Sequence, residues 1–423
     1  MACHASIDAI ERVWREESAR LVGGLVRLVR DVGLAEDLAQ DALLAALDRW
    51  PASGIPANPG AWLMTTARNR ALDGLRRREM LERKHAQLAH EPRPEVSEPP
   101  LEPPPTDDVG DDVLRLMLIA CHPVLSREAR VALTLKLLGG LSTGEIARAF
   151  LVAEPTVAQR IVRAKRTLSE ARVPFEVPTG EALSARLASV LEVVYLVFNE
   201  GYAATRGDDW VRPALCDDAL RLAHTLADLV PGEAEVHGLV ALLELQASRL
   251  EARTDANGDA VLLLEQDRTR WDRVRIDRGL RALQRADALA RPLGVYSLQA
   301  AIASCHARAV TPEATDWERI VALYDALVEV TQSPIVALNR AVAVGMAFGP
   351  DEGLELVDTL ADAPVLEGYH LLPAVRADLL AKLGRTEEAR AELERAAFLA
   401  QNAKERALLL ERARSLVESG DGR

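Results

Sequence analysis

The chain has 423 residues and a formal net charge of −13, with 49% hydrophobic but only 4% aromatic residues. That length predicts about three compact units, and the abundance of Ala and Leu favours a soluble, largely helical protein. The acidic total excludes a protein that covers nucleic acid with its whole surface. Charged residues appear near the N-terminus before any long apolar run, which argues against a signal peptide. The four cysteines are widely spaced, which argues against a disulfide framework. We therefore expect a cytoplasmic protein with no membrane segment.

The first expected domain, residues 5–89, begins with two amphipathic helices. Apolar residues recur at a spacing of three or four from Ile10 to Leu28, which is the period of a helix with one buried face. A second helix is expected to begin after Gly33 and to stop at Trp50, because Pro51 follows. The two helices would bury their apolar faces together.

A third helix is expected where Asn58 can act as N-cap and Pro59 occupies the first helical position. This helix leads into residues 68–84, which contain seven basic residues against three acidic ones. Since the whole chain is acidic, this local excess of positive charge predicts a surface for an anionic partner such as nucleic acid.

Residues 90–112 read as a linker. They contain seven prolines, which cannot share a packed helix, and eight acidic residues against one arginine. Mutual repulsion of the carboxylates is expected to keep the segment extended. The segment could also pass through a basic channel in a partner, mimicking the charge of nucleic acid.

The second expected domain, residues 113–172, contains a helix-turn-helix pattern. Ser142 as N-cap and Glu145 three residues later form a capping box at the start of a short helix. A second helix is expected over residues 154–165, with Val157 and Ile161 facing inward. Hydroxyl and amide groups near its start and guanidinium groups beyond them suit a recognition helix in the major groove. The residues expected to project outward are Thr156, Gln159, Arg160, Arg163 and Arg166.

The rest of the chain is expected to be a helical extension over residues 180–290 and tetratricopeptide-like repeats over residues 291–420. In the extension, Asn257 and Gly258 predict a turn joining two short strands, the second leading into residues 261–264. In the repeats, residues 349–354 and 384–389 each join two helical segments and lie about 35 residues apart, the period of a tetratricopeptide helix pair. Ala389, Leu393 and Ala396 would interlock the second pair.

Three of these segments together resemble extracytoplasmic-function sigma factors of the sigma-70 family. Residues 36–43 resemble the polymerase-clamp-binding helix of that family, residues 58–73 its promoter-melting helix, and residues 141–165 its fourth conserved region. The resemblance covers residues 5–172. The extension, through residues 195–202 and 267–272, resembles the subgroup that carries a tetratricopeptide-like domain. The implied fold is all-α, with two small sigma domains, an acidic linker and a C-terminal helical domain.

The resemblance implies contacts with core RNA polymerase and promoter DNA as partners. The residues implied to bind polymerase are Asp37, Leu38, Gln40, Asp41 and Leu44. Those implied for the minus-ten element are Asn58, Trp62, Arg68, Asn69, Arg76 and Arg77. Those implied for the minus-thirty-five element are Ser142, Thr143, Thr156, Gln159, Arg160, Arg163 and Lys165. Trp62 is as compatible with a core role as with base stacking, and Pro155 departs from the small residue usual in the family.

The alternatives are a helix-turn-helix activator with a helical sensor domain that never becomes a polymerase subunit, and a scaffold without a DNA role. The clamp-binding and promoter-melting patterns argue against the activator, and the placement of two basic helices argues against the scaffold. We find neither a HExxH nor a Walker motif, and the histidines lack ligand spacing, so no enzyme activity, cofactor or metal is expected. The C-terminal repeats are expected to modulate the sigma module through a protein or an intramolecular partner.

Overall fold

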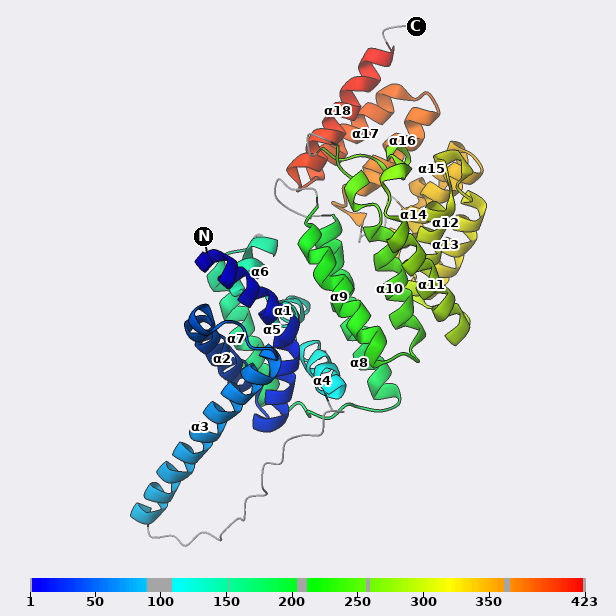
Figure 1. The fold of residues 1–423 in the computed structure, drawn as a ribbon. Helices are drawn as coiled ribbons and strands as arrows, with labels where there is room; N and C mark the ends of the chain where they lie inside the picture. Colours follow the sequence, from blue (N-terminus) through cyan, green and yellow to red (C-terminus); the bar gives the residue numbers. More distant parts are fainter. Residues whose placement is uncertain are drawn as a thin grey trace. The chain divides into compact units, whose positions relative to one another are not determined.

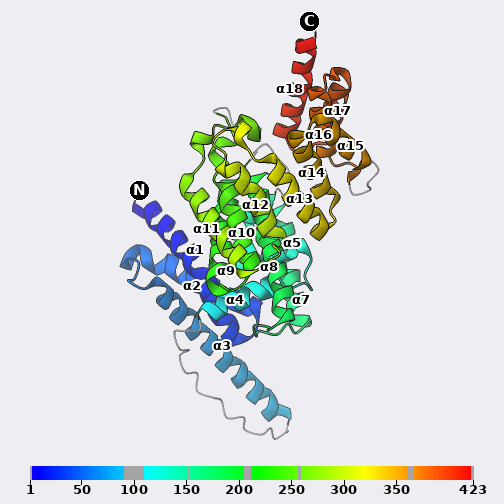
Figure 2. The same ribbon diagram turned by 90° about the vertical axis from the view of Figure 1, so that its right-hand side faces the viewer.

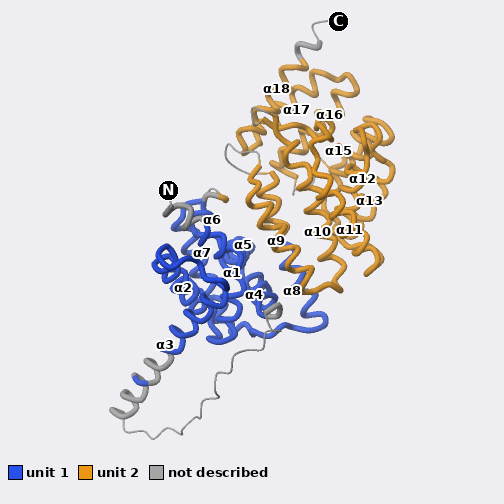
Figure 3. The backbone as a smooth tube through the Cα atoms, in the orientation of Figure 1, with its two compact units in different colours: residues 1–148, 152–193 blue, residues 149–151, 194–423 orange. Residues whose placement is uncertain are grey.

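The computed structural model describes residues 2–89, 109–150, 152–203, 211–255, 259–360 and 366–420. Within these ranges every regular element is a helix, which confirms the all-α prediction. None of the helices in these ranges is long and apolar enough to cross a membrane. The chain forms two compact units (Figure 3), one of residues 1–148 and 152–193 and one of residues 149–151 and 194–423.

The first unit contains seven helices and the first half of an eighth (Figure 1). These are α1 (Ala2–Val29), α2 (Val32–Ser53), α3 (Pro59–Ala89), α4 (Val109–Ala120), α5 (Arg127–Leu137), α6 (Thr143–Phe150), α7 (Glu154–Glu170) and α8 (Glu181–Tyr202). Its core is built from helices of both expected sigma domains, since Leu25 of α1, Leu63 of α3, Leu116 of α4 and Leu133 of α5 are almost fully buried. The two domains are therefore packed in one unit.

Helix α2 differs from its prediction at both ends. It begins at Val32, because the Asp31 side chain accepts a hydrogen bond from the backbone N–H of Leu34. It also continues through Pro51 to Ser53, so the prediction that it stops at Trp50 was wrong. A proline in the last turn costs little more than one intrahelical hydrogen bond, and the buried Trp50 side chain holds this turn on the core.

Helix α4 begins at Val109, inside the segment expected to be linker. Asp112, counted among the repelling linker carboxylates, is only 5% exposed and pairs with Arg115 at 2.8 Å and Arg27 at 3.6 Å. Opposite charges therefore hold this carboxylate inside the unit. The remainder of the expected linker, residues 90–108, lies outside the described residues.

The helix-turn-helix prediction is confirmed locally. The Ser142 hydroxyl accepts from the N–H of Glu145 at 3.1 Å, and the Glu145 carboxylate accepts from the N–H of Ser142 at 2.7 Å, which is the reciprocal capping box. Helix α7 begins at Glu154 as expected and runs on to Glu170, with Val157 and Ile161 buried. Asn58 also caps α3 as predicted, accepting from the N–H of Ala61.

The first half of α8 belongs to the first unit. Ser189 donates a hydrogen bond to the carbonyl oxygen of Cys121 at 2.6 Å, and Glu192 accepts from Arg127 and Arg130. Because these contacts tie α8 to α4 and α5, the unit continues to residue 193, beyond the expected domain end at residue 172. Burial raises the pKa of the Cys121 thiol to about 12, so this cysteine stays a protonated core residue.

The second unit is a succession of helices (Figures 1 and 2). After the second half of α8 these are α9 (Pro213–Leu229), α10 (Ala234–Ala247), α11 (Arg273–Leu289), α12 (Val295–Arg308), α13 (Trp317–Thr331), α14 (Pro334–Ala347), α15 (Pro350–Leu360), α16 (Leu371–Lys382), α17 (Thr386–Leu399) and α18 (Ala403–Gly420). From α12 onward each helix packs on the next, as a tetratricopeptide-like array requires. Ala389, Leu393 and Ala396 are buried as predicted.

The strand pair expected around Asn257 and Gly258 is not formed by the described residues, which show one isolated bridge between Thr254 and Ala260. Instead of a second strand, the chain enters a 3-10 helix, Leu263–Glu265. Leu263 packs there against the buried cluster that contains Leu245 and Trp271, so tertiary packing overrides the local strand preference. Residues 256–258 themselves lie outside the described residues.

Replacing Gly353 by Ala should destabilise the second unit. The added Cβ would lie 2.8 Å from the Cα of Gly345 and 3.0 Å from the carbonyl oxygen of Ala341, both backbone atoms of α14. Helices α14 and α15 must then separate, at a cost of about 1–3 kcal/mol that exceeds the gain in helix propensity of about 1 kcal/mol. A thermal melt followed by circular dichroism should show a lower midpoint. In the control Gly232→Ala, the Cβ meets nothing within 4 Å, and an equal drop there would contradict this account.

Candidate nucleic-acid interface

The outward face of α7 borders an open groove of about 380 Å³ at the N-terminal end of α5. Thr156, Gln159 and Arg163 line it as exposed side chains and Arg160 as a half-buried one. Hydroxyl, amide and guanidinium groups thus lie along one helix face, the set that reads base edges and holds phosphates. The structure brings together these four of the seven residues predicted for the minus-thirty-five element.

A carboxylate, Glu128, lies close to Arg160 of this groove. The backbone N–H of Glu128, followed by the Ser126 hydroxyl and the positive charge of Arg160, lowers the pKa of the Glu128 carboxyl. The carboxylate is therefore ionised at neutral pH close to Arg160.

The N-terminal end of α6 supplies the two remaining polar candidates on the helix-turn-helix. The Ser142 oxygen is engaged in the capping box, which leaves its O–H able to donate to an acceptor. Thr143, the first residue of α6, is half-buried. Glu145 also pairs with Arg15 of α1 at 2.8 Å, so this end of α6 is held against the first helix.

Lys165 is not part of the groove. Its ammonium forms an ion pair with the Glu36 carboxylate of α2, and its side chain is only 19% exposed. The same carboxylate lies 3.8 Å from the ammonium of Lys136 on α5, and the whole Glu36 residue is 5% exposed. The structure thus separates Lys165 from Arg160 and Arg163, with which the sequence grouped it.

Glu36 is the functional residue that sequence reasoning missed. It lies on the face of α2 that contains the buried residues Val32 and Ala39, four residues before it and three after it. A carboxylate on an apolar helix face is a signal of a buried ion pair, because an unpaired buried charge is too costly. The identity of its partners could not have been read from the sequence.

The opposite face of α2 is open. Asp37 and Asp41 are exposed, and Leu44 is 61% exposed, one turn farther along the helix. Asp41 pairs with Arg70 of α3 at 3.2 Å, but this pair is solvent-exposed. Leu38 is buried instead and supports the helix. The Gln40 amide donates to Glu36 at 2.7 Å, which connects the open face to the buried ion pair.

The minus-ten candidates lie on α3. Asn58 caps the helix, and Trp62 is half-buried with its ring edge-on to Trp50, the centroids 5.2 Å apart. The Trp62 ring is therefore partly committed to the core. Arg68 is half-buried and Asn69 exposed. The side chains of Arg76 and Arg77 lie outside the described residues.

Comparison with known proteins agrees with this geometry. The chain matches the Sigma-70 region 2 family over residues 13–80, the Sigma-70 region 4 family over residues 115–168, and a family of unknown function, DUF6596, over residues 186–287. The first two matches coincide with α1 to α3 and with α4 to α7. The third begins in α8 and ends in α11.

One relative matches nearly the whole chain, and others match its first part. An uncharacterized protein of Rhizobium meliloti, R00370, is 44% identical over 391 residues, 92% of this chain and 91% of that protein. The ECF RNA polymerase sigma factor SigL of Mycobacterium tuberculosis is 32% identical over 168 residues, 40% of this chain and 90% of SigL. The probable ECF sigma factor SigI of the same species is 29% identical over 177 residues, 41% of this chain and 59% of SigI. The chain is therefore a member of the ECF RNA polymerase sigma factors, extended at its C-terminus by a second helical unit.

Proposed function

We propose that this sigma factor joins core RNA polymerase through the open face of α2 and places α3 and α7 on the minus-ten and minus-thirty-five elements. The observation that carries the proposal is the division of α2 into two faces. One face presents Asp37, Asp41 and Leu44 to solvent, and the other binds the recognition-helix domain through Glu36. Carboxylates around an exposed leucine suit a basic partner surface with an apolar centre.

The first unit is then a closed form of the sigma module. The two promoter elements are about 25 base pairs apart, roughly 85 Å along B-form DNA. Helices α2 and α7 are instead in contact through the Glu36 and Lys165 ion pair. The two domains must separate for both elements to be bound, and binding to polymerase would supply the free energy for that opening.

Run-off transcription tests the function directly. Sigma-free core polymerase supplemented with this protein should initiate at a specific start site on the protein's own candidate promoters. A helix-turn-helix activator that never joins polymerase would retard duplex DNA but would give no transcript with core alone. If the protein neither binds core polymerase nor supports initiation with it, the proposal is refuted.

Replacing Arg160 by Ala should weaken binding to the minus-thirty-five element by about 1–3 kcal/mol if its guanidinium reads a base edge. The effect should be measured by fluorescence anisotropy on matched and scrambled duplexes at one salt concentration, because phosphate contacts depend on salt. Arg12→Ala is the control, since Arg12 is an exposed arginine on α1 and lies outside both the groove and the outward face of α7. An equal loss on both duplexes would reassign Arg160 to phosphate binding.

The second unit supplies the modulating domain in this proposal, through a protein or an intramolecular partner. Phe398 of α17 is 86% exposed, and an exposed aromatic ring on a repeat array suits a contact with another protein surface. The protein is expected to act in the cytoplasm, where polymerase and promoters are found.

A further inference from the structure

A cavity of about 580 Å³ lies inside the first unit, and we propose that it binds a small organic anion that holds the sigma module closed. The ends of α1 and α7, the start of α2, helix α4 and the segment after α7 form its walls. Its volume lies in the range of small-molecule sites, about 300–1,000 Å³. It is distinct from the α7 groove and from the open face of α2.

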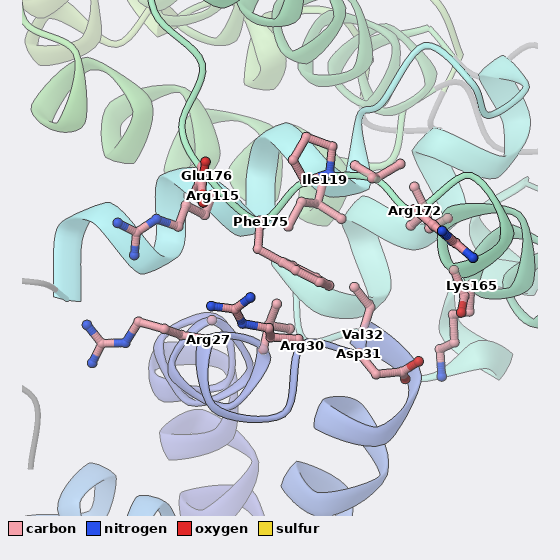
Figure 4. A pocket seen from close by; sticks show the side chains of 16 residues that line it. Arg27, Arg30, Asp31, Val32, Arg115, Ile119, Lys165, Arg172, Phe175 and Glu176 are labelled. Atoms are coloured by element: carbon pink, nitrogen blue, oxygen red, sulfur yellow. The ribbon is translucent and has the colours of Figure 1, made fainter. Parts of the chain in front are cut away.

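The lining is basic although the chain is acidic. Arg27, Arg30, Arg115, Lys165 and Arg172 line the cavity against Asp31 and Glu176. In Figure 4, Arg30, which follows α1, lies beside Phe175, whereas the guanidinium groups of Arg27 on α1 and Arg115 on α4 extend away from that ring. Since low-dielectric walls strengthen a field of one sign, this excess of cations favours an anionic ligand.

Two of these arginines supply the charge that the protein does not itself satisfy. Arg27 and Arg115 are paired with Asp112, and Lys165 with Glu36. Arg30 and Arg172 are exposed to solvent, and no carboxylate among the described residues forms an ion pair with either guanidinium. A ligand anion could pair with either of these guanidinium groups, whose N–H donors match carboxylate and phosphate oxygens in pairs.

The backbone at both arginines is unusual. Arg30 has φ 51° and follows the end of α1, and Arg172 has φ 48° and follows the end of α7. This left-handed position after a helix is ordinarily occupied by Gly, and sometimes Asn, because a larger side chain is strained there. Strained residues are often kept at binding sites, and here both carry a guanidinium that lines the same cavity.

The remaining walls are apolar. Val32, Ile119 and Phe175 line the cavity, and the Phe175 ring is half-buried and extends into it (Figure 4). A small hydrated anion such as phosphate would leave this surface wet. An anion with an aromatic or aliphatic body would cover it while its charged end meets Arg30 or Arg172, which lie on opposite sides of the Phe175 ring in Figure 4.

Such a ligand would touch both promoter-binding domains at once. Arg30 lies between the first two region 2 helices and Val32 begins the second, whereas Arg172 and Phe175 follow the region 4 helix-turn-helix. Anything that binds only the closed form stabilises it by mass action. The anion would therefore oppose the opening required for initiation, and this regulatory step rests on the proposed function.

The binding test uses the full-length chain and the fluorescent aryl sulfonate 8-anilinonaphthalene-1-sulfonate. Saturable binding is expected, weakened at least tenfold in the double variant Arg30→Asn with Arg172→Asn, because Asn tolerates the left-handed backbone but lacks the charge. The control Arg12→Ala with Arg49→Ala removes two exposed arginines outside the cavity and should leave binding within twofold. Arg172→Glu alone should weaken the dye similarly if the double variant fails to fold. Unchanged binding in a folded Arg30 or Arg172 variant would overturn the inference.

Competition identifies the body of the ligand. Displacement of the dye by adenosine monophosphate assigns an aromatic anion, and displacement by decanoate assigns an aliphatic one. Displacement by neither, or by inorganic phosphate equally well, would overturn the inference. The displacing compound should reduce run-off transcription by the natural protein and not by the Arg30→Asn, Arg172→Asn variant. Dye binding without this inhibition would refute only the proposal that the anion holds the sigma module closed. If the natural protein gives no transcript even when neither adenosine monophosphate nor decanoate is added, the proposed function itself is refuted.

Discussion

Replacing Glu36 by Gln is expected to lower the free energy of unfolding of the first unit by about 3 kcal/mol. The change removes one charge from a buried cluster and leaves the ammonium groups of Lys136 and Lys165 without their carboxylate, a class of change that costs about 3–5 kcal/mol. The glutamine amide keeps the shape of the side chain and some of its hydrogen bonding, so the loss of stability is expected at the lower end of that range. Urea unfolding followed by circular dichroism would measure it.

The same variant should gain function in a DNA-binding assay. With Glu36 neutral, the closed form loses the ion pair between α2 and α7, so a larger fraction of molecules is open before polymerase binds. Affinity for a minus-thirty-five duplex should rise, and run-off transcription should need less sigma factor. Loss of stability with unchanged DNA affinity would show that the ion pair is structural only.

Asp48→Asn provides the matched control for Glu36→Gln. Asp48 lies on the same helix but is exposed, so the exchange removes the same charge without opening a buried pair. Its effect on unfolding should stay within about 0.5 kcal/mol. If Glu36→Gln behaved like this control, the burial of the Glu36 carboxylate between α2, α5 and α7 would be contradicted.

Replacing Leu44 by Asp should reduce affinity for core polymerase about 30-fold or more. An exposed leucine between carboxylates is the apolar centre of the proposed interface, and truncating such a centre costs about 2 kcal/mol or more. A buried new carboxylate adds its own desolvation cost. Competition of labelled and unlabelled sigma factor for core polymerase, without DNA, would measure the loss. Folding should be unaffected, because Leu44 is 61% exposed.

Val162→Asp is the control for Leu44→Asp. Val162 is 65% exposed on α7, in the same unit, so the two exchanges are equal in chemistry and nearly equal in exposure. Polymerase affinity without DNA should change little. Equal losses in both variants would indicate a general effect of surface charge, and no loss in Leu44→Asp would move the polymerase contact away from the open face of α2.

Several features of this protein follow from its sequence alone, and they are all local. The capping box of Ser142 and Glu145, the cap at Asn58 and the inward face of Val157 and Ile161 depend on residues three or four positions apart. Such signals read the same in any tertiary context. The order of three such patterns also led to the sigma-factor resemblance, which the Sigma-70 region matches confirm.

Only the tertiary structure determines which charged residues, distant from one another in the sequence, form ion pairs. An acidic residue at the end of a proline-rich stretch is usually solvated, so Asp112 is counted among the linker carboxylates, and the sequence names no partner for Glu36. Each is buried only because basic side chains of other helices reach it, Arg27 in one case and Lys165 in the other. The free energy of burying a charge depends on partners that folding brings together, and no local pattern encodes which helices those will be.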